Sequence, residues 1–218
     1  MSDNFNEENV PEVYTDDEFM IIDNHISAFF GQISNVFHEI VSPDIHVDIC
    51  VINPTTERNY YTFVTMGMGA HRMPIPEKLR EAKIDRAELL ITLPPTWEIQ
   101  NTDEKWFWPI RWLKVLARLP GQQNAWYAYG HTVSNGGPFA ENTELCGAML
   151  TFPYSFDPPA FRCTMPDGSN VVFYQVLPLY ENEMNYKLEN DAEALEELFP
   201  EDYDMVVDIT RENVLEDE

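Results

Sequence analysis

Residues 60–97 read YYTFVTMGMGAHRMPIPEKLREAKIDRAELLITLPPTW, and this stretch decides the fold. It begins with an aromatic and β-branched run, 60–65, which is typical of a strand. A loop containing two glycines and two prolines follows, and then a short charged helix is expected over 77–87. The next run, Glu88–Leu93, is apolar on both faces, so it predicts a strand in the centre of a sheet.

The preceding residues predict a helix followed by a strand. The sequence TDDE at 15–18 is a capping box, and apolar residues then recur every three or four positions up to Phe37. We therefore expect a helix that ends at Ser42-Pro43, with Gly31 as a candidate interruption. Residues 45–51 alternate between apolar and polar, which predicts a strand antiparallel to the one at 60–65.

The following residues predict a second helix, several strands and a helical end. A helix is expected to begin at Pro109, and we expect its basic stripe to pair with the protein's own carboxylates. Strands are expected within 122–133, 146–156, 161–165 and 170–179, with a hairpin turn at 166–169. Helices should begin near Glu181 and Asn190, and 203–209 is either an edge strand or a tail. The pattern predicts one α+β domain with a mixed, mostly antiparallel sheet flanked by helices.

Charge is distributed unevenly along this chain of 218 residues and net charge −25. Residues 1–57 contain 12 acidic and no basic residues, 58–180 contain 11 of each, and 181–218 contain 15 acidic and 2 basic. Such acidity disfavours binding to nucleic acid or to an anionic membrane, and it favours attraction of a basic protein. Alternatively, the charge only keeps the protein soluble.

The cysteines and the N-terminus favour a cytoplasmic protein. Cys50, Cys146 and Cys163 are odd in number and widely spaced, so they predict no disulfide framework and no zinc site. MSDNFNEENV has neither the basic start nor the apolar core of a signal peptide. We expect no membrane span, because no run of about 18 apolar residues occurs.

The loop at 66–73, MGMGAHRM, is the most interesting candidate site. It departs from the phosphate-binding pattern G-x-G-x-x-G at its last position, where Arg72 stands, so no nucleotide cofactor is expected. Its methionines either fill the core or offer an adaptable surface to a partner. His38, Glu39, His46 and Asp48 lack a recognised metal-ligand spacing, so no metal is expected.

Five segments of the sequence match those of one protein family and occur in the same order as in that family. They are TMGMGAHRMPIP (65–76), RAELLITLPPTW (86–97), WPIRWLKVLARLP (108–120), YGHTVSNGGPFAENT (129–143) and VVFYQVLPLYENEM (171–184). Together they resemble the Suppressor of fused domain family in its bacterial single-domain form. The resemblance implies a protein-binding module and carries no catalytic motif. For a bacterial member it implies an immunity-type protein that neutralises a cognate toxin by binding it.

The main hypothesis is therefore a non-enzymatic protein-binding domain that occludes a toxin, such as a basic nuclease. Candidate partner-binding residues are Met68, His71, Arg72, Met73, His131, Phe139 and Glu141. One alternative is a regulatory scaffold that captures a peptide by strand addition, and an exposed sheet edge beside a hydrophobic groove would favour it. Another is an enzyme using His71, His131, Glu141 and Glu144.

The chain divides into three predicted parts on charge and pattern. These are an acidic flexible segment at 1–14, the Suppressor of fused-like domain at 15–209, and an acidic tail at 210–218.

Overall fold

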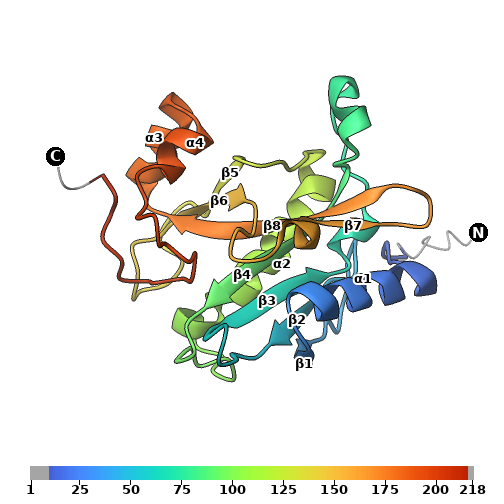
Figure 1. Ribbon diagram of the computed structural model, residues 1–218, viewed down its shortest axis with the longest axis horizontal. Coiled ribbons are helices and arrows are strands. Elements are labelled where there is room, and N and C mark those ends of the chain that lie inside the picture. The colour runs from blue at the N-terminus through green and yellow to red at the C-terminus, as the bar shows by residue number, and fades with distance from the viewer. Residues whose placement is uncertain (1–9, 216–218) are drawn as a thin grey trace, which may run out of the picture.

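The computed structural model describes residues 10–215, and it shows one α+β domain built on a mixed sheet of eight strands (Figure 1). The strands are β1 (Ile33–Phe37), β2 (Asp48–Ile52), β3 (Tyr61–Met66), β4 (Arg86–Leu93), β5 (Thr132–Ser134), β6 (Gly147–Thr151), β7 (Arg162–Thr164) and β8 (Asn170–Leu179). The α-helices are α1 (Asp16–Phe29), α2 (Glu104–Gln123), α3 (Glu181–Glu189) and α4 (Ala192–Glu196). Short 3-10 helices cover Met68–Ala70 (η1), Glu77–Ala82 (η2) and Pro158–Phe161 (η3). The predicted fold class is confirmed.

The strand order is β1-β2-β3-β4-β8-β6-β5, with β7 also paired to β8. The β4–β8 pair is parallel and the other pairs are antiparallel. In Figure 1, α1 lies in front of the sheet and α2 behind it, while α3 and α4 lie beside the end of β8. The sheet is therefore covered on both faces, which is what a strand with two apolar faces requires.

The central strand β4 is buried along its whole length, as its sequence predicts. Leu89, Ile91 and Leu93 join the core beneath α2, whereas Leu90 joins the core beneath α1. Each of these four side chains is fully buried. The period of two in this segment therefore assigns every apolar side chain to one of two cores.

The predicted long helix at the N-terminal side ends early, and its second half is a strand. α1 has the predicted capping box at Thr15, but it stops at Phe29. The predicted interruption at Gly31 is confirmed: this residue adopts φ of 125°, a conformation that favours glycine, and β1 follows. The spacing of Ile33 and Phe37 is compatible with a helix, so the sequence pattern hides this change. His38 accordingly follows a strand rather than lying on a helix.

Other boundaries also differ from the prediction. α2 begins at Glu104, capped by the side chain of Asp103, so Pro109 lies inside the helix rather than at its start. The expected helix at 77–87 is only the 3-10 turn η2, and the strand expected within 122–133 is limited to β5. Within 203–209, only an isolated bridge between Val206 and Thr92 forms. The hairpin turn at 166–169 is confirmed by the pairing of β7 with β8.

The side chain of Glu88 is buried and joins three parts of the chain. Its carboxyl oxygens accept hydrogen bonds from the Tyr14 hydroxyl (2.7 Å), the Thr65 hydroxyl (2.5 Å) and the backbone amides of Gly67 (2.9 Å) and Gly69 (3.1 Å). Burial raises the pKa of Glu88 above its ordinary value, against the opposing effect of these donors. Glu88 thereby connects the N-terminal segment and the loop at 66–73, which we call the glycine loop, to β4.

At Gly67, the glycine loop passes close to the backbone of His46. This residue has φ of 125°, and a Cβ atom there would lie 2.0 Å from the carbonyl oxygen of His46. Only glycine fits both constraints. The two glycines in the loop therefore serve to bring their amides to Glu88, which is a structural role.

The described residues on either side of the predicted domain boundaries at 15 and 209 also contact the domain. Tyr14 is buried against Glu88, and Glu12 pairs with Ile45. At the other end, Arg211 forms an ion pair with the fully buried Glu183 at the start of α3. The boundaries themselves stay predictions, and residues 1–9 and 216–218 lie outside the described residues.

The replacement Glu88→Ala should cost about 3 kcal/mol or more of unfolding free energy, because it leaves several buried donors without an acceptor. Glu88→Gln keeps an acceptor for Tyr14, Gly67 and Gly69 and should stay within about 1 kcal/mol of the original protein at pH 5. The measurement is urea unfolding of all three proteins at pH 5 and pH 8.

The pH dependence should follow the raised pKa of Glu88. A carboxyl whose folded pKa is raised contributes stability below its ordinary pKa near 4.5 and loses it as pH rises through the folded pKa. The free energy of unfolding of the wild-type protein should therefore fall relative to that of Glu88→Gln between pH 5 and pH 8. An unchanged difference from Glu88→Gln over that range would mean that Glu88 is already ionised in the fold at pH 5.

Arg211→Ala should destabilise the protein by about 3–5 kcal/mol, because it leaves the Glu183 carboxylate buried without its cation. Arg162→Ala provides the control, since Arg162 is exposed and should change stability by less than about 0.5 kcal/mol. Thermal unfolding of both variants tests this. Equal effects of the two substitutions would show that the Arg211–Glu183 pair contributes nothing particular.

Candidate functional site

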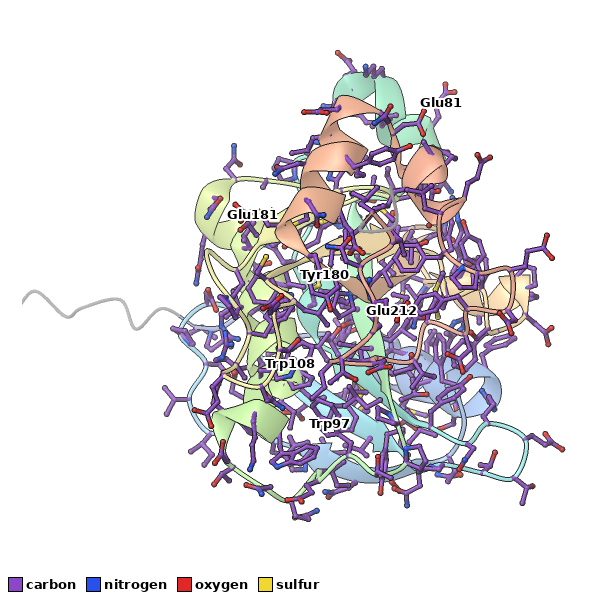
Figure 2. The ribbon with its side chains drawn as sticks, turned by 90° about the vertical axis from the view of Figure 1, so that its left-hand side faces the viewer. Glu81, Trp97, Trp108, Tyr180, Glu181 and Glu212 are labelled. Atoms are coloured by element: carbon purple, nitrogen blue, oxygen red, sulfur yellow. The ribbon has the colours of Figure 1, made fainter. Side chains whose placement is uncertain are left out.

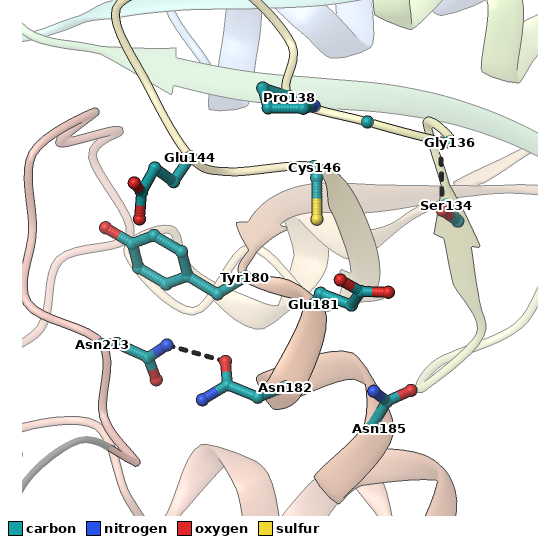
Figure 3. Close-up of a pocket in the computed structure, with 11 residues that line it drawn as sticks. Ser134, Gly136, Pro138, Glu144, Cys146, Tyr180, Glu181, Asn182, Asn185 and Asn213 are labelled. Carbon is teal, nitrogen blue, oxygen red and sulfur yellow. Dashed lines mark hydrogen bonds between the residues drawn. The ribbon is translucent and has the colours of Figure 1, made fainter.

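An open groove of about 640 Å³ lies between the β5–β6 connection and the start of α3 (Figure 3). Its lining residues are Ser134, Gly136, Gly137, Pro138, Glu144, Cys146, Tyr180, Glu181, Asn182, Asn185 and Asn213. They come from three segments that are distant in sequence. We call this feature the polar groove.

The first wall of the polar groove is the turn after β5. Gly136 has φ of 79°, and its amide donates to the hydroxyl of Ser134 at 3.0 Å. The side-chain amide of Asn135 donates to the carbonyl oxygen of Gly137 at 2.8 Å. These local bonds fix a turn of the kind that Asn and Gly favour. β5 is an edge strand, so this wall continues into one edge of the sheet.

The second wall is the start of α3 together with the C-terminal segment. Asn213 donates to the side chain of Asn182 at 2.7 Å, and Figure 3 shows this bond as a dashed line below Tyr180. Arg211 reinforces the contact, because it donates to Glu183 Oε1 at 2.6 Å and lies over the ring of Tyr180. The groove therefore depends on the C-terminal segment for its shape.

The polar groove is negatively charged and rich in hydrogen-bond acceptors. Glu144 and Glu181 are both exposed, and none of the described residues that line the groove is basic. Burial, and then the charges of Glu181 and Glu183, raise the pKa of the Cys146 thiol. A thiolate is the reactive form of cysteine, so these surroundings make Cys146 a poor nucleophile. The groove suits cationic or hydrogen-donating groups.

Three of the sequence-predicted contact residues are core residues. Met68, Met73 and Phe139 are 3%, 4% and 2% exposed. Met73 sulfur accepts the amide of Tyr127 at 3.3 Å, and Phe139 stacks on Trp108 with ring centroids 4.4 Å apart. In this conformation none of the three presents a surface to a partner, because all are enclosed by the core beneath α2.

His71 and Arg72 are held by carboxylates of the same chain. His71 Nδ1 lies 3.0 Å from a carboxyl oxygen of Glu12. Arg72 donates to Asp85 at 2.7 Å and to Asp167 at 2.5 Å, and its side chain is 49% exposed. Arg72 therefore joins the glycine loop to the β7–β8 turn while remaining accessible on one side.

His131 and Glu141 do not form the conceivable acid–base pair. His131 Nδ1 lies 3.1 Å from the carbonyl oxygen of Trp126, whose ring also contacts the imidazole. Burial lowers the pKa of His131. Glu141 is exposed, and within the described residues no hydrogen bond connects any two of His71, His131, Glu141 and Glu144.

The residues considered as metal ligands are close together but engaged with one another. His38 and His46 both contact Asp48, at 2.9 Å and 3.2 Å. Glu39 pairs with Arg118 at 2.6 Å and with Lys114 at 3.7 Å. Within residues 10–215 no group of histidine, cysteine or acidic side chains has the arrangement of a metal site.

The basic stripe on α2 pairs with the protein's own carboxylates, as predicted. Arg111 contacts Glu104 at 2.5 Å, and Arg118 contacts both Glu39 and Asp44. The stripe therefore stabilises the fold and is only partly available to a ligand.

Figure 2 shows two tryptophans of the core, Trp97 and Trp108, together in the lower half of the molecule, with Tyr180 and Glu181 above them.

The polar groove was missed in the sequence, although a signal was present. Two of the five family-like segments, 129–143 and 171–184, each supply part of its lining. They are separated by 27 residues, and only the pairing of β6 with both β5 and β8 brings them together. The available clue was the presence of turn-forming and polar residues in both segments, 134–138 in the first and 180–182 in the second.

None of the helices in the described part of the chain combines the length and apolar character needed to cross a membrane.

Comparison with known proteins identifies the family. The family model for Suppressor of fused protein (SUFU) matches residues 43–212. An uncharacterized protein of Ureaplasma parvum serovar 3, UU111, is 24% identical over 203 residues, which cover 92% of this chain and 96% of that protein.

Solved structures show the same fold. A SUFU homolog from Neisseria gonorrhoeae superposes with a TM-score of 0.65 at 20% identity, covering 90% of this chain and 96% of that one. A chain of the Sufu–Fu complex gives a TM-score of 0.66 at 12% identity, covering 94% and 93%. Drosophila Suppressor of Fused gives 0.61 at 12% identity, with 94% of this chain matching 52% of that one. The chain belongs to the Suppressor of fused protein family.

Proposed function

We propose that this protein is a non-enzymatic, cytoplasmic protein-binding domain that neutralises a cognate basic toxin by covering its functional surface. Membership of a family in which Sufu has been solved in complex with Fu supports the protein-binding part of this proposal. The charge and the polar groove support a basic partner. Nucleic acid and anionic membranes would be repelled by the same charge.

The observation that carries the proposal is the acidic lining of the polar groove, together with the acidity of the C-terminal part of the chain. The segment 181–218 contains 15 acidic and 2 basic residues. One of the two basic residues, Arg211, is bound to Glu183 and is mostly buried, so it neutralises little of the surface. Glu144, Glu181 and Glu212 are exposed, and Figure 2 shows Glu181 and Glu212 near Tyr180.

Charge of this kind acts mainly on the approach and orientation of a partner. Complementary potentials accelerate association, and they penalise partners of the wrong sign. A toxin that binds nucleic acid requires a basic surface, because it must contact phosphates. An acidic domain seated on that surface excludes the substrate, so inhibition needs no chemistry.

The proposed contact surface differs from the anchors expected in the sequence. Met68, Met73 and Phe139 are buried, so we assign the main contacts to Glu144, Glu181 and the groove asparagines. We keep four further residues as predicted secondary contacts with the partner: His71, Arg72, His131 and Glu141. The raised pKa of Cys146 and the separate partners of His71 and His131 support a non-enzymatic role.

A second candidate, a scaffold that captures a peptide by strand addition, is favoured by β1. This strand is one edge of the sheet, and it borders a hollow of about 550 Å³. The hollow is lined by apolar side chains that include Val36, Phe107 and Val115, with Arg111 and Lys114 beside them. An exposed edge next to an apolar hollow can accept an extended peptide, here one with acidic residues.

The double charge reversal Glu144→Lys with Glu181→Lys should reduce capture of the partner about tenfold. The matched control is Glu77→Lys with Glu81→Lys on η2, which changes the net charge equally at exposed positions. Immobilised protein is incubated with lysate of the native host, and retained proteins are eluted with salt and identified by mass spectrometry. A basic protein should bind at about 50 mM salt and elute by about 500 mM, since salt screens such contacts.

Co-expression then tests neutralisation. The captured protein alone should stop growth, the original chain should restore growth, and the groove variant should not. Equal capture by the groove and control variants would remove the polar groove from the proposal. Retention of acidic or peptide-like partners that is lost on changing β1 would establish the scaffold candidate instead.

A further inference from the structure

A second hollow, of about 430 Å³, opens where Tyr154 faces the segment between Phe199 and Met205. Three aromatic rings line it, those of Tyr154, Phe199 and Tyr203. Phe199 and Tyr203 lie with ring centroids 4.8 Å apart, and Tyr154 is 52% exposed. The buried side chains of Leu177 and Met205 complete the lining. We call this feature the aromatic hollow.

The aromatic hollow is also lined by carboxylates. Glu196, Glu197 and Glu201 belong to it, and no lysine or arginine is found among the described residues that line it. Glu196 is fixed in place, since it accepts from the Tyr129 hydroxyl at 2.8 Å and from the Thr151 hydroxyl at 2.5 Å. Glu197 and Glu201 are exposed.

The negative charge affects the aromatic residues themselves. Burial, followed by the charge of Glu196, raises the pKa of Tyr154. Its hydroxyl therefore stays neutral at physiological pH and its ring keeps the electron-rich face that attracts cations. Rings and carboxylates here act in the same direction, and both favour a positive group.

The protein already places one guanidinium against one of these rings, that of Phe199. The Arg211 guanidinium carbon lies 5.1 Å from the centre of the Phe199 ring and 4.8 Å from that of Tyr180. The same side chain is bound to the buried Glu183. A planar cation held between an aromatic ring and a glutamate is thus a stable arrangement in this part of the fold.

We propose that the aromatic hollow binds the guanidinium group of an arginine side chain presented by a basic protein partner. This inference rests on the proposed function, because it assumes that the partner is a basic protein. Arginine fits better than lysine, since its planar group stacks on tyrosine while its N–H donors reach a glutamate carboxylate. An acidic group would be repelled by the three glutamates, and a neutral side chain would gain no charge interaction.

The probe is N-acetyl-arginine-amide, titrated into the full chain and followed by the amide NMR signals of Phe199 and of residues 201–205. Saturable shifts with a Kd in the millimolar range are expected, in line with the few atoms of such a ligand. N-acetyl-citrulline-amide, which has nearly the same shape without the charge, should bind at least about fivefold more weakly.

Two sets of variants test separately how much the Tyr154 ring and the carboxylates contribute to binding of the arginine probe. Tyr154→Leu should weaken binding of the arginine probe at least about fivefold, whereas Tyr154→Phe should preserve it, because the ring face is retained. Glu197→Gln with Glu201→Gln should weaken binding, and Glu77→Gln with Glu81→Gln, with the same charge change elsewhere, should not. Tyr154, Glu197 and Glu201 are exposed, so these variants should fold.

Several outcomes would overturn the inference. They are the absence of shifts at Phe199 and 201–205, equal binding of the citrulline probe, or equal loss in the two glutamine pairs. The outcome for the proposed function is separate. If a basic protein is captured through the polar groove while the arginine probe fails, the proposed function stands and the aromatic hollow has no part in it.

Discussion

The carboxyl group of Glu88 is the interaction on which the rest of the structure depends. It lies in the central strand and accepts donors from the N-terminal segment, from β3 and from two amides of the glycine loop. Each donor would otherwise be buried without a partner, which costs free energy in a low-dielectric interior. One polar residue therefore fixes a loop whose own sequence, rich in glycine and methionine, is locally ambiguous.

The acidic end of the molecule relies on an equivalent arrangement. Glu183 is fully buried, and Arg211 both neutralises it and bonds the carbonyl oxygen of Pro178. The C-terminal segment is thereby placed against α3, where Asn213 completes the polar groove and Arg211 covers one side of Phe199. Arg211 thus contacts one residue of the polar groove, Tyr180, and one of the aromatic hollow, Phe199.

The sequence predicts the sheet better than the site, for physical reasons. The apolar residues on both faces of β4 report burial directly, and the capping box at Thr15 is a local chemical signal. The end of α1 was misplaced because Ile33 and Phe37 suit either period, and the start of α2 was misplaced because Pro109 is tolerated within the helix. The polar groove depends on non-local strand pairing, and the burial of Met68, Met73 and Phe139 depends on tertiary contacts that their composition does not encode.

The pairing of Glu183 with Arg211 has a consequence for biosynthesis. The two residues are separated by 28 positions, so the carboxylate leaves the ribosome well before its cation. Domains fold as synthesis proceeds from the N-terminal side. Most of the sheet can form while Glu183 is still unpaired, but α3 and the polar groove gain their final arrangement only after residue 211 has emerged. A nascent chain therefore completes the polar groove only after most of the sheet has formed.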